Sequence, residues 1–311
     1  MNRSIWILTG ILAMLPYDIG GARAETVYIP GGSADEVLVV DAATDTVVGH
    51  LSGLPAVHGL GGAPGGRYLV AGSYAESSPA EMPAVDKPAG VSQDAHAAHH
   101  GAAAKAETKR ALGILTVIDK VDGSTAARLE VPGAVHHVAV SPDGRYAVAT
   151  HPNDDGISVV DLSDFTLRPL LRTGSFPNYA VFSPDGSRVY ISNSGNGTVS
   201  EVDTTRWIVR RNLVAGESPE HLAIEPAGRE LYVANVEAGA VSVLALASGE
   251  VTRSIPVGGE IHGLDVSDDG ETLFVSGKEE DKLVAIGLRS GKLRSAPLGP
   301  APYHLAVIRG T

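Results

Sequence analysis

The sequence predicts an all-β fold, because one short pattern recurs along the chain at a constant interval. In each copy a run of apolar residues leads into Ser-Pro-Asp-Gly or a closely related turn. Four of these turns end at Gly144, Gly186, Gly228 and Gly270, a constant step of 42 residues. A period of about 40 to 50 residues with several short strands per repeat is typical of the blades of a β-propeller.

Each repeat divides into four short strands separated by glycine-rich turns. In the clearest repeat we expect strands at residues 137–140, 145–150, 156–161 and 166–171. The sequence therefore predicts a single propeller of six four-stranded blades. Seven blades is the less favoured alternative, since it requires a degenerate repeat that we cannot find. The six innermost strands begin near His58, His137, Tyr179, His221, Gly263 and His304.

The two ends of the chain complement each other. Residues 26–29 match the second strand of a repeat, and residues 304–308 match the first strand. We expect these N- and C-terminal strands to pair and close the ring, which would remove the exposed edges of an open sheet.

Residues 1–24 have the pattern of a signal peptide. Arg3 supplies a positive start, residues 4–15 form a short apolar core, and Ala22-Arg23-Ala24 is a small-x-small cleavage site. We therefore expect cleavage near Ala24, a propeller domain over residues 25–311, and a periplasmic or secreted protein.

An insertion at about residues 74–112 interrupts one blade. It is rich in Ala, Pro, Ser and charged residues and poor in large apolar ones, so we expect a mobile loop. At its centre lie His96, His99 and His100.

The composition excludes several classes of function. The 311-residue chain has no cysteine, so it uses neither a disulfide nor a thiolate ligand or nucleophile. Its formal net charge of −12 disfavours nucleic acid and anionic membranes as partners, because both select for clustered Lys and Arg. No apolar stretch is long enough for a spanning helix, so we expect no membrane insertion once the leader is removed. We also expect a monomer.

Two strands carry a resemblance to a known repeat. Leu231-Tyr-Val-Ala-Asn235 and Val189-Tyr-Ile-Ser-Asn193 each follow a Pro-x-Gly turn. This pattern resembles the YVTN family of β-propeller repeats, over nearly all of the chain outside the insertion and the leader. The resemblance implies the fold. It does not determine the function, because the same repeat is found in surface-layer proteins, lactonase-like enzymes and propeller domains of periplasmic nitrite and nitrous oxide reductases.

In overall plan the chain also resembles periplasmic propeller metallochaperones of the AztD type. Those zinc carriers combine a propeller with a histidine-rich segment, which is the combination seen here. The resemblance implies a metal-handling role and gives no ligand residue by residue.

Histidines gather at two adjacent positions at the entry to the innermost strands, and every blade but the fourth, which has Asn178 and Tyr179 there, carries at least one. In a propeller these strand entries converge around the axial channel, and we expect the insertion loop to emerge on the same face. Adjacent positions along a strand point in different directions, so we do not expect His136 and His137 both to face the axis. His50 is instead expected on an outer strand. The candidate metal ligands at this end of the channel are His58, His136, His137, His221, His262, His304, His151, His96, His99 and His100.

Neutral imidazole is a good ligand for zinc and for Cu(II), and the absence of cysteine disfavours a Cu(I) carrier. We therefore expect a periplasmic metal-binding protein, with Zn²⁺ as the first candidate and Cu²⁺ as the second. Its role would be delivery or sequestration of the ion, with a transporter, an apo-enzyme or another periplasmic protein as partner. A histidine at a strand entry can also serve only as a hydrogen-bond partner of the backbone.

Two other hypotheses stay open. A lactonase-like or lyase-like enzyme would use histidine and Glu220 at the channel mouth as acid–base groups, although no nucleophile motif supports it. For this reason we favour a role other than catalysis. A protein-interaction scaffold, which would use the faces of the propeller, needs no buried histidines.

Overall fold

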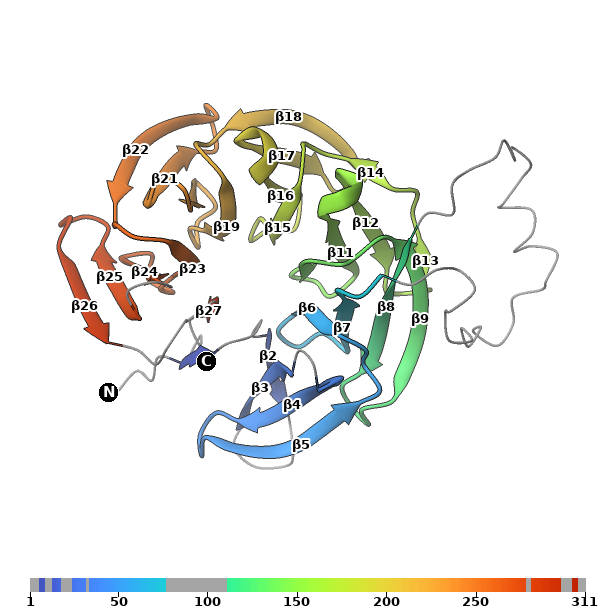
Figure 1. Ribbon diagram of the computed structural model, residues 1–311. Helices are drawn as coiled ribbons and strands as arrows, with labels where there is room; N and C mark the ends of the chain where they lie inside the picture. The colour runs from blue at the N-terminus through green and yellow to red at the C-terminus, as the bar shows by residue number, and fades with distance from the viewer. Residues whose placement is uncertain are drawn as a thin grey trace.

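The chain folds into a ring of six antiparallel sheets that stand around a common centre as the blades of a propeller (Figure 1). The computed structural model describes residues 6–8, 13–17, 24–31, 34–76, 111–277, 281–297 and 304–306. The prediction of an all-β propeller with six blades is confirmed. Two single 3₁₀ turns interrupt the described part of the chain, η1 (Pro152–Asp154) and η2 (Ser194–Asn196).

The blades follow one another along the chain, and each begins at the centre of the ring and ends at its rim (Figure 1). Blade 1 contains β2 (Ala13–Tyr17), β3 (Ala24–Pro30), β4 (Glu36–Asp41) and β5 (Thr46–Ser52). Blade 2 contains β6 (Val57–Gly62), β7 (Tyr68–Ser73), β8 (Leu112–Asp119) and β9 (Thr125–Pro132). Blade 3 contains β10 (Val138–Val140), β11 (Tyr146–His151), β12 (Gly156–Asp161), β13 (Thr166–Leu167) and β14 (Leu171–Arg172).

The second half of the ring repeats the same order. Blade 4 contains β15 (Pro177–Phe182), β16 (Arg188–Asn193), β17 (Thr198–Asp203) and β18 (Ile208–Val214). Blade 5 contains β19 (Pro219–Ile224), β20 (Glu230–Asn235), β21 (Ala240–Ala245) and β22 (Glu250–Pro256). Blade 6 contains β23 (Ile261–Val266), β24 (Thr272–Gly277), β25 (Lys282–Gly287) and β26 (Leu293–Pro297).

The outer strand of blade 3 is divided in two. Both β13 and β14 pair with β12, and Pro169 lies between them. Proline has no N–H group to give to a strand ladder, so it is tolerated at a sheet edge only where pairing is interrupted.

The Pro-Asp-Gly pattern forms the turn between the first and second strands of a blade. In blade 3 the Asp143 carboxylate accepts from the Ser141 hydroxyl, and the Tyr146 N–H donates to Ser141 Oγ at 2.9 Å. Gly144 has a φ of 71°, a left-handed conformation that glycine adopts without steric cost. The turn is therefore closed by its own side chains, which explains why the pattern recurs so regularly.

Apolar residues of the second and third strands hold consecutive blades together. Val241 and Val243 of blade 5 and Leu273 and Val275 of blade 6 have no exposed surface and belong to one cluster. Strands buried on both faces read as continuous apolar runs, whereas the outer strands, which face solvent on one side, alternate.

The chain termini pair, but in a different arrangement from the expected one. The C-terminal strand β27 (His304–Ala306) pairs with β1 (Trp6–Leu8), and β3 pairs with β2. We expected residues 304–308 to lie against residues 26–29. That edge of β3 can accept one partner only, and residues 13–17 occupy it.

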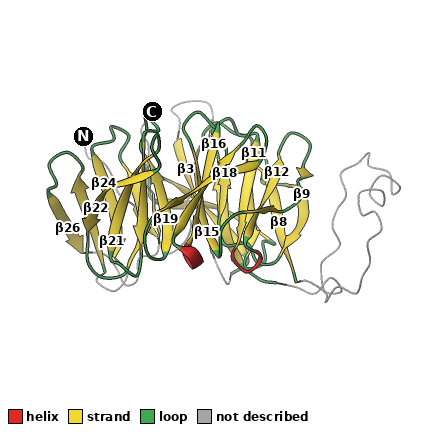
Figure 2. Cartoon of the chain, turned by 90° about the horizontal axis from the view of Figure 1, so that it is seen from above, coloured by secondary structure: helices red, strands yellow, loops and turns green. Residues whose placement is uncertain are grey.

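Strands run between the two faces of the ring, with η1 and η2 at the same edge (Figure 2). The predicted insertion falls between β7 and β8, and its residues 77–110 lie outside the described part of the chain. In the described residues no helix is long and apolar enough to cross a membrane.

Candidate axial site

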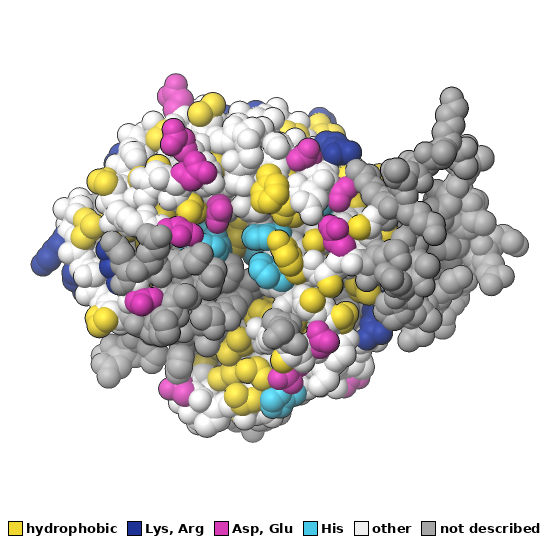
Figure 3. Space-filling model, viewed as in Figure 1, with side chains coloured by type: hydrophobic (Ala, Val, Ile, Leu, Met, Phe, Trp, Pro, Cys, Tyr) yellow, Lys and Arg dark blue, Asp and Glu magenta, His cyan; other side chains and the backbone are white. Residues whose placement is uncertain are grey.

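Histidine side chains gather around the hollow at the centre of one face (Figure 3). They belong to two positions that recur at the inner strands. We call the first position the first layer, which comprises His58, His136, Asn178, Glu220 and His262, and the next residue along the chain the second layer, which comprises His137, Tyr179 and His221.

Hydrogen bonds to the neighbouring blade fix two imidazoles of the first layer. His58 Nδ1 donates to the backbone carbonyl of His136 at 2.8 Å, and His136 Nδ1 donates to that of Asn178 at 3.0 Å. A carbonyl oxygen can only accept, so each neutral ring carries its proton on Nδ1 and a lone pair on Nε2. The two rings lie 4.9 Å apart between centroids. The first layer thus presents two adjacent imidazoles in one defined tautomer.

His136 stays uncharged down to low pH. Burial lowers the pKa of His136 from 6.5 to about 4, the charge of His58 acts in the same direction, and the Asn178 carbonyl opposes them. Because protons and metal ions compete for the same lone pair, a neutral imidazole at pH 7 is ready to act as a ligand.

Ring contacts run along the second layer and end on His262 of the first layer. His137 lies against Tyr179 at 3.7 Å, Tyr179 against His221 at 4.5 Å, and His221 against His262 at 4.8 Å, all between ring centroids. His137 Nδ1 accepts from the backbone N–H of Ala180 at 3.2 Å, so its proton is on Nε2. His136 and His137 therefore occupy separate layers and hold opposite tautomers.

The first layer also contains a carboxylate. Glu220 Oε2 lies 3.7 Å from His262 Nε2, and both side chains are partly exposed. A carboxylate beside an imidazole can orient the ring or exchange a proton with it, which gives the site one group suited to acid–base chemistry.

His151 lies inside a blade and away from the channel positions. It ends β11 with no exposed surface, its Nδ1 donates to the Ala134 carbonyl at 3.2 Å, and its Nε2 lies 2.8 Å from Ser158 Oγ. Asn193 holds the equivalent place one blade later and donates to Ser200 Oγ, also seven residues downstream. In the sequence His151 aligns with Asn193 and Asn235 at intervals of 42 residues, and this alignment indicates a buried hydrogen-bonding role within the blade.

Four candidates cannot be placed. The side chain of His304 at the start of β27 and the residues His96, His99 and His100 lie outside the described part of the chain. His50 lies exposed on the outer strand β5, as expected, with Nδ1 2.9 Å from Glu36 Oε2. Among the residues that the structure describes, no three His, Cys, Asp or Glu side chains are arranged to hold a metal ion together.

Sequence reasoning missed the part played by blade 4. Asn178 and Tyr179 broke the histidine pattern, yet the Asn178 carbonyl accepts from His136 and the Tyr179 ring continues the stack. A backbone acceptor leaves no trace in the sequence. An aromatic residue in a histidine position was the only available signal for the stack.

The comparisons with known proteins bear mainly on the fold. Residues 150–263 match the family model described as lactonase with a seven-bladed β-propeller. Hydrazine synthase from Kuenenia stuttgartiensis superposes with a TM-score of 0.70 at 17% identity, over 96% of this chain and 89% of that one. A functionally unknown protein from Desulfotomaculum acetoxidans superposes with a TM-score of 0.72 at 14% identity, over 94% and 88%. No curated protein matches the sequence. The chain is therefore similar in fold to these proteins.

Proposed function

We propose that the axial site binds a divalent transition metal, Zn²⁺ first and Cu²⁺ as the alternative, for delivery or sequestration. The observation that carries the proposal is the pair His58 and His136. Each ring has its Nδ1 proton bonded to a backbone carbonyl. Metal-bound histidines in proteins commonly have this arrangement, because the outer hydrogen bond orients the ring and raises its basicity at Nε2.

Further ligands would come from the rest of the mouth. His262 and Glu220 lie in the same layer, and the pKa of His136 responds to His262. His304 and the insertion histidines His96, His99 and His100 are candidates to complete the coordination. We assign His137 and His221 to the support of the first layer, because the Nδ1 lone pair of His137 is already used by the Ala180 N–H.

The test is calorimetric titration of Zn²⁺ into protein purified without a histidine tag. The double variant His58→Gln/His136→Gln should lose at least tenfold in affinity, while His50→Gln, which removes an exposed histidine on β5, should bind like the unaltered chain. Equal affinity in all three proteins would overturn the proposal. Titration of Cu²⁺ in the same series decides which metal is preferred.

The leader pattern of residues 1–24 supports a periplasmic or secreted location. Cleavage near Ala24 would remove β2 and leave that edge of β3 open to residues 304–308. At that location the propeller would exchange the ion with a transporter, an apo-enzyme or another periplasmic protein. Deletion of residues 77–110 should slow ion loading if the insertion histidines collect the metal. A scaffold that docks through other surfaces would keep its partner after the same deletion.

Hydrolysis of a lactone is the second candidate. It is supported by the match of residues 150–263 to a lactonase family model and by the 3.7 Å approach of Glu220 to His262. Glu220 would act as general base toward water. Glu220→Gln should abolish hydrolysis in a lactone panel, and hydrolysis that persists in this variant would rule this candidate out.

A further inference from the structure

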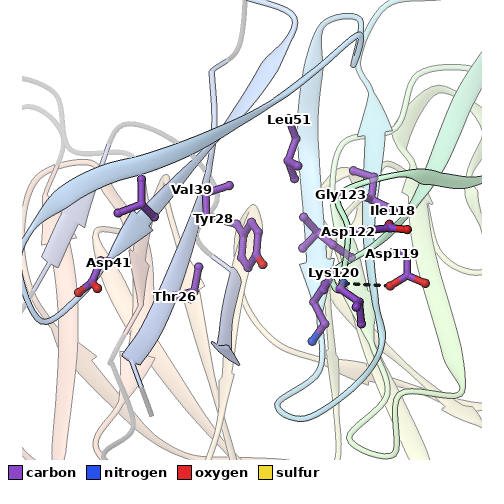
Figure 4. A pocket seen from close by; sticks show the side chains of 13 residues that line it. Thr26, Tyr28, Val39, Asp41, Leu51, Ile118, Asp119, Lys120, Asp122 and Gly123 are labelled. Carbon is purple, nitrogen blue, oxygen red and sulfur yellow. Dashed lines mark hydrogen bonds between the residues drawn. The ribbon is translucent and has the colours of Figure 1, made fainter. Parts of the chain in front are cut away.

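A cavity of about 350 Å³ opens between blades 1 and 2, and its lining includes no residue of the first or second layer (Figure 4). Thr26, Tyr28 and Val39 line it from blade 1, and Ile118 and Lys120 line it from blade 2. Its volume lies at the lower end of the range for small-molecule sites, about 300 to 1,000 Å³.

Two other blade boundaries are closed at this place by a pair of aromatic rings. Trp207 of blade 4 packs edge-on against Tyr146 of blade 3 at 5.1 Å between centroids, and Phe165 of blade 3 packs against Tyr68 of blade 2 at 5.3 Å. Both Trp207 and Phe165 have positive φ, 54° and 60°, in the turn between the third and fourth strands.

Strand register shows which residues replace this pair at the cavity. Tyr68 pairs with Asp119 and Tyr146 with Asp161, and in blade 1 the corresponding pair is Thr26 with Asp41. Phe165 and Trp207 come four positions after Asp161 and Asp203 in the chain, and the position four after Asp119 in blade 2 is Gly123. Both aromatic positions therefore hold a small residue here, and both line the cavity.

Two further boundaries are closed in a second way. Arg211 of blade 4 reaches across to donate from Nη2 to the Leu246 carbonyl, and Arg253 of blade 5 donates from Nη1 to the Leu288 carbonyl at 3.1 Å. Arg211 lies opposite Glu201 and Arg253 opposite Val243. In blade 1 the equivalent residue is Gly49, opposite Val39.

Aromatic pairs or arginine side chains close the four boundaries from blade 2 to blade 6. The boundary between blades 1 and 2 has neither. We propose that this cavity binds a small aromatic molecule carrying a hydroxyl or N–H group, of the phenol or indole class. The ring would take the place of the missing Trp or Phe side chain between Tyr28 and Leu51.

Comparison of the blades also gives a hydrogen-bond acceptor for the polar group of the ligand. Lys120 stands at the position of Leu246 and Leu288, whose carbonyl oxygens accept from arginine at the other boundaries. A ligand hydroxyl or N–H can donate to the Lys120 carbonyl in the same way. The Lys120 side chain also lines the cavity, and its Nζ donates to the Ala63 carbonyl at 3.4 Å.

The test uses phenol and indole as probes, with cyclohexanol as the non-aromatic control, in saturation-transfer NMR and calorimetry on the full chain. We expect saturable binding of the aromatic probes and binding at least tenfold weaker for cyclohexanol. Absence of saturable binding of both aromatic probes would overturn the proposal.

Two variants introduce at this boundary the side chains that close the other blade boundaries. Thr26→Tyr/Gly123→Trp introduces the aromatic pair. Gly49→Arg introduces the arginine that reaches a backbone carbonyl of the next blade. A Cβ at Gly49 would meet Val39 at 3.5 Å, an ordinary contact, so the second variant should fold even if the first does not. Each folded variant should weaken probe binding at least tenfold, and Val251→Arg on the exposed outer strand of blade 5 should leave it unchanged. Unchanged binding in a folded plugged variant would contradict the assignment of the cavity.

Discussion

Replacing His151 with asparagine should make the protein more resistant to acid. The His151 ring is fully buried and bonded at both nitrogens, to the Ala134 carbonyl and to Ser158. Asparagine already occupies this place in blades 4 and 5 as Asn193 and Asn235, where it donates to the equivalent serine. The substitution therefore keeps a hydrogen-bonding side chain and removes one titratable group.

The sign of the effect follows from the pKa of His151, which burial lowers from 6.5 to about 4. Above pH 6.5 the ring is neutral in both the folded and the unfolded chain and contributes nothing to the pH dependence. As the pH falls from 6.5 toward 4, the unfolded chain takes up a proton that the folded chain does not, so stability is lost. At about 1.4 kcal/mol per pH unit, the loss due to this one residue reaches about 2.5 kcal/mol by pH 4.5.

Urea unfolding at pH 7.5 and pH 4.5 measures this difference. The unaltered chain should lose about 2.5 kcal/mol more of its free energy of unfolding between the two pH values than His151→Asn does. His50→Asn, at an exposed position on β5, controls for the loss of an imidazole as such. Equal losses in the unaltered chain and in His151→Asn would refute the reasoning.

Two more substitutions test the contacts that hold the blades. Trp207→Ala removes a ring that is 8% exposed and packs on Tyr146, and it should lower the free energy of unfolding by about 3 to 5 kcal/mol in urea denaturation. Asn193→Ala leaves the buried N–H of Gly174 without its acceptor, whereas the Ser200 hydroxyl keeps its bond to Asn212. The unsatisfied N–H should cost about 1 to 3 kcal/mol, read as a lower melting temperature. A melting temperature unchanged within a degree in either variant would contradict its assigned role.

The ring of blades could be predicted because its signal is local and repeated. The turn at Ser141 to Gly144 is closed by its own side chains, so the sequence that specifies it lies within four residues. Strand bounds in blade 3 came within one or two residues of those observed, except where Pro169 divides the outer strand.

The candidate site could be predicted in position but not in chemistry. His58 and His136 stand where the repeat placed them, yet their tautomers depend on backbone carbonyls one blade away. His151 was assigned to a loop because Pro-Asn-Asp follows it, although β11 extends through it. The cavity beside Thr26 went unnoticed, since an absent side chain becomes visible only when the strand registers of several blades are compared.

The contacts between blades have a consequence for how the size of the ring is set. The Thr150 hydroxyl donates to the Asn178 carbonyl, and 42 residues later the Ser192 hydroxyl donates to the Glu220 carbonyl. Any following blade with the same inner strand can accept such a bond. The contacts at one boundary therefore do not determine how many blades close the ring. Duplication or deletion of one whole blade would preserve these bonds and change only the angle between consecutive blades. This is how a stretch of a six-bladed ring can match a model built from seven-bladed ones.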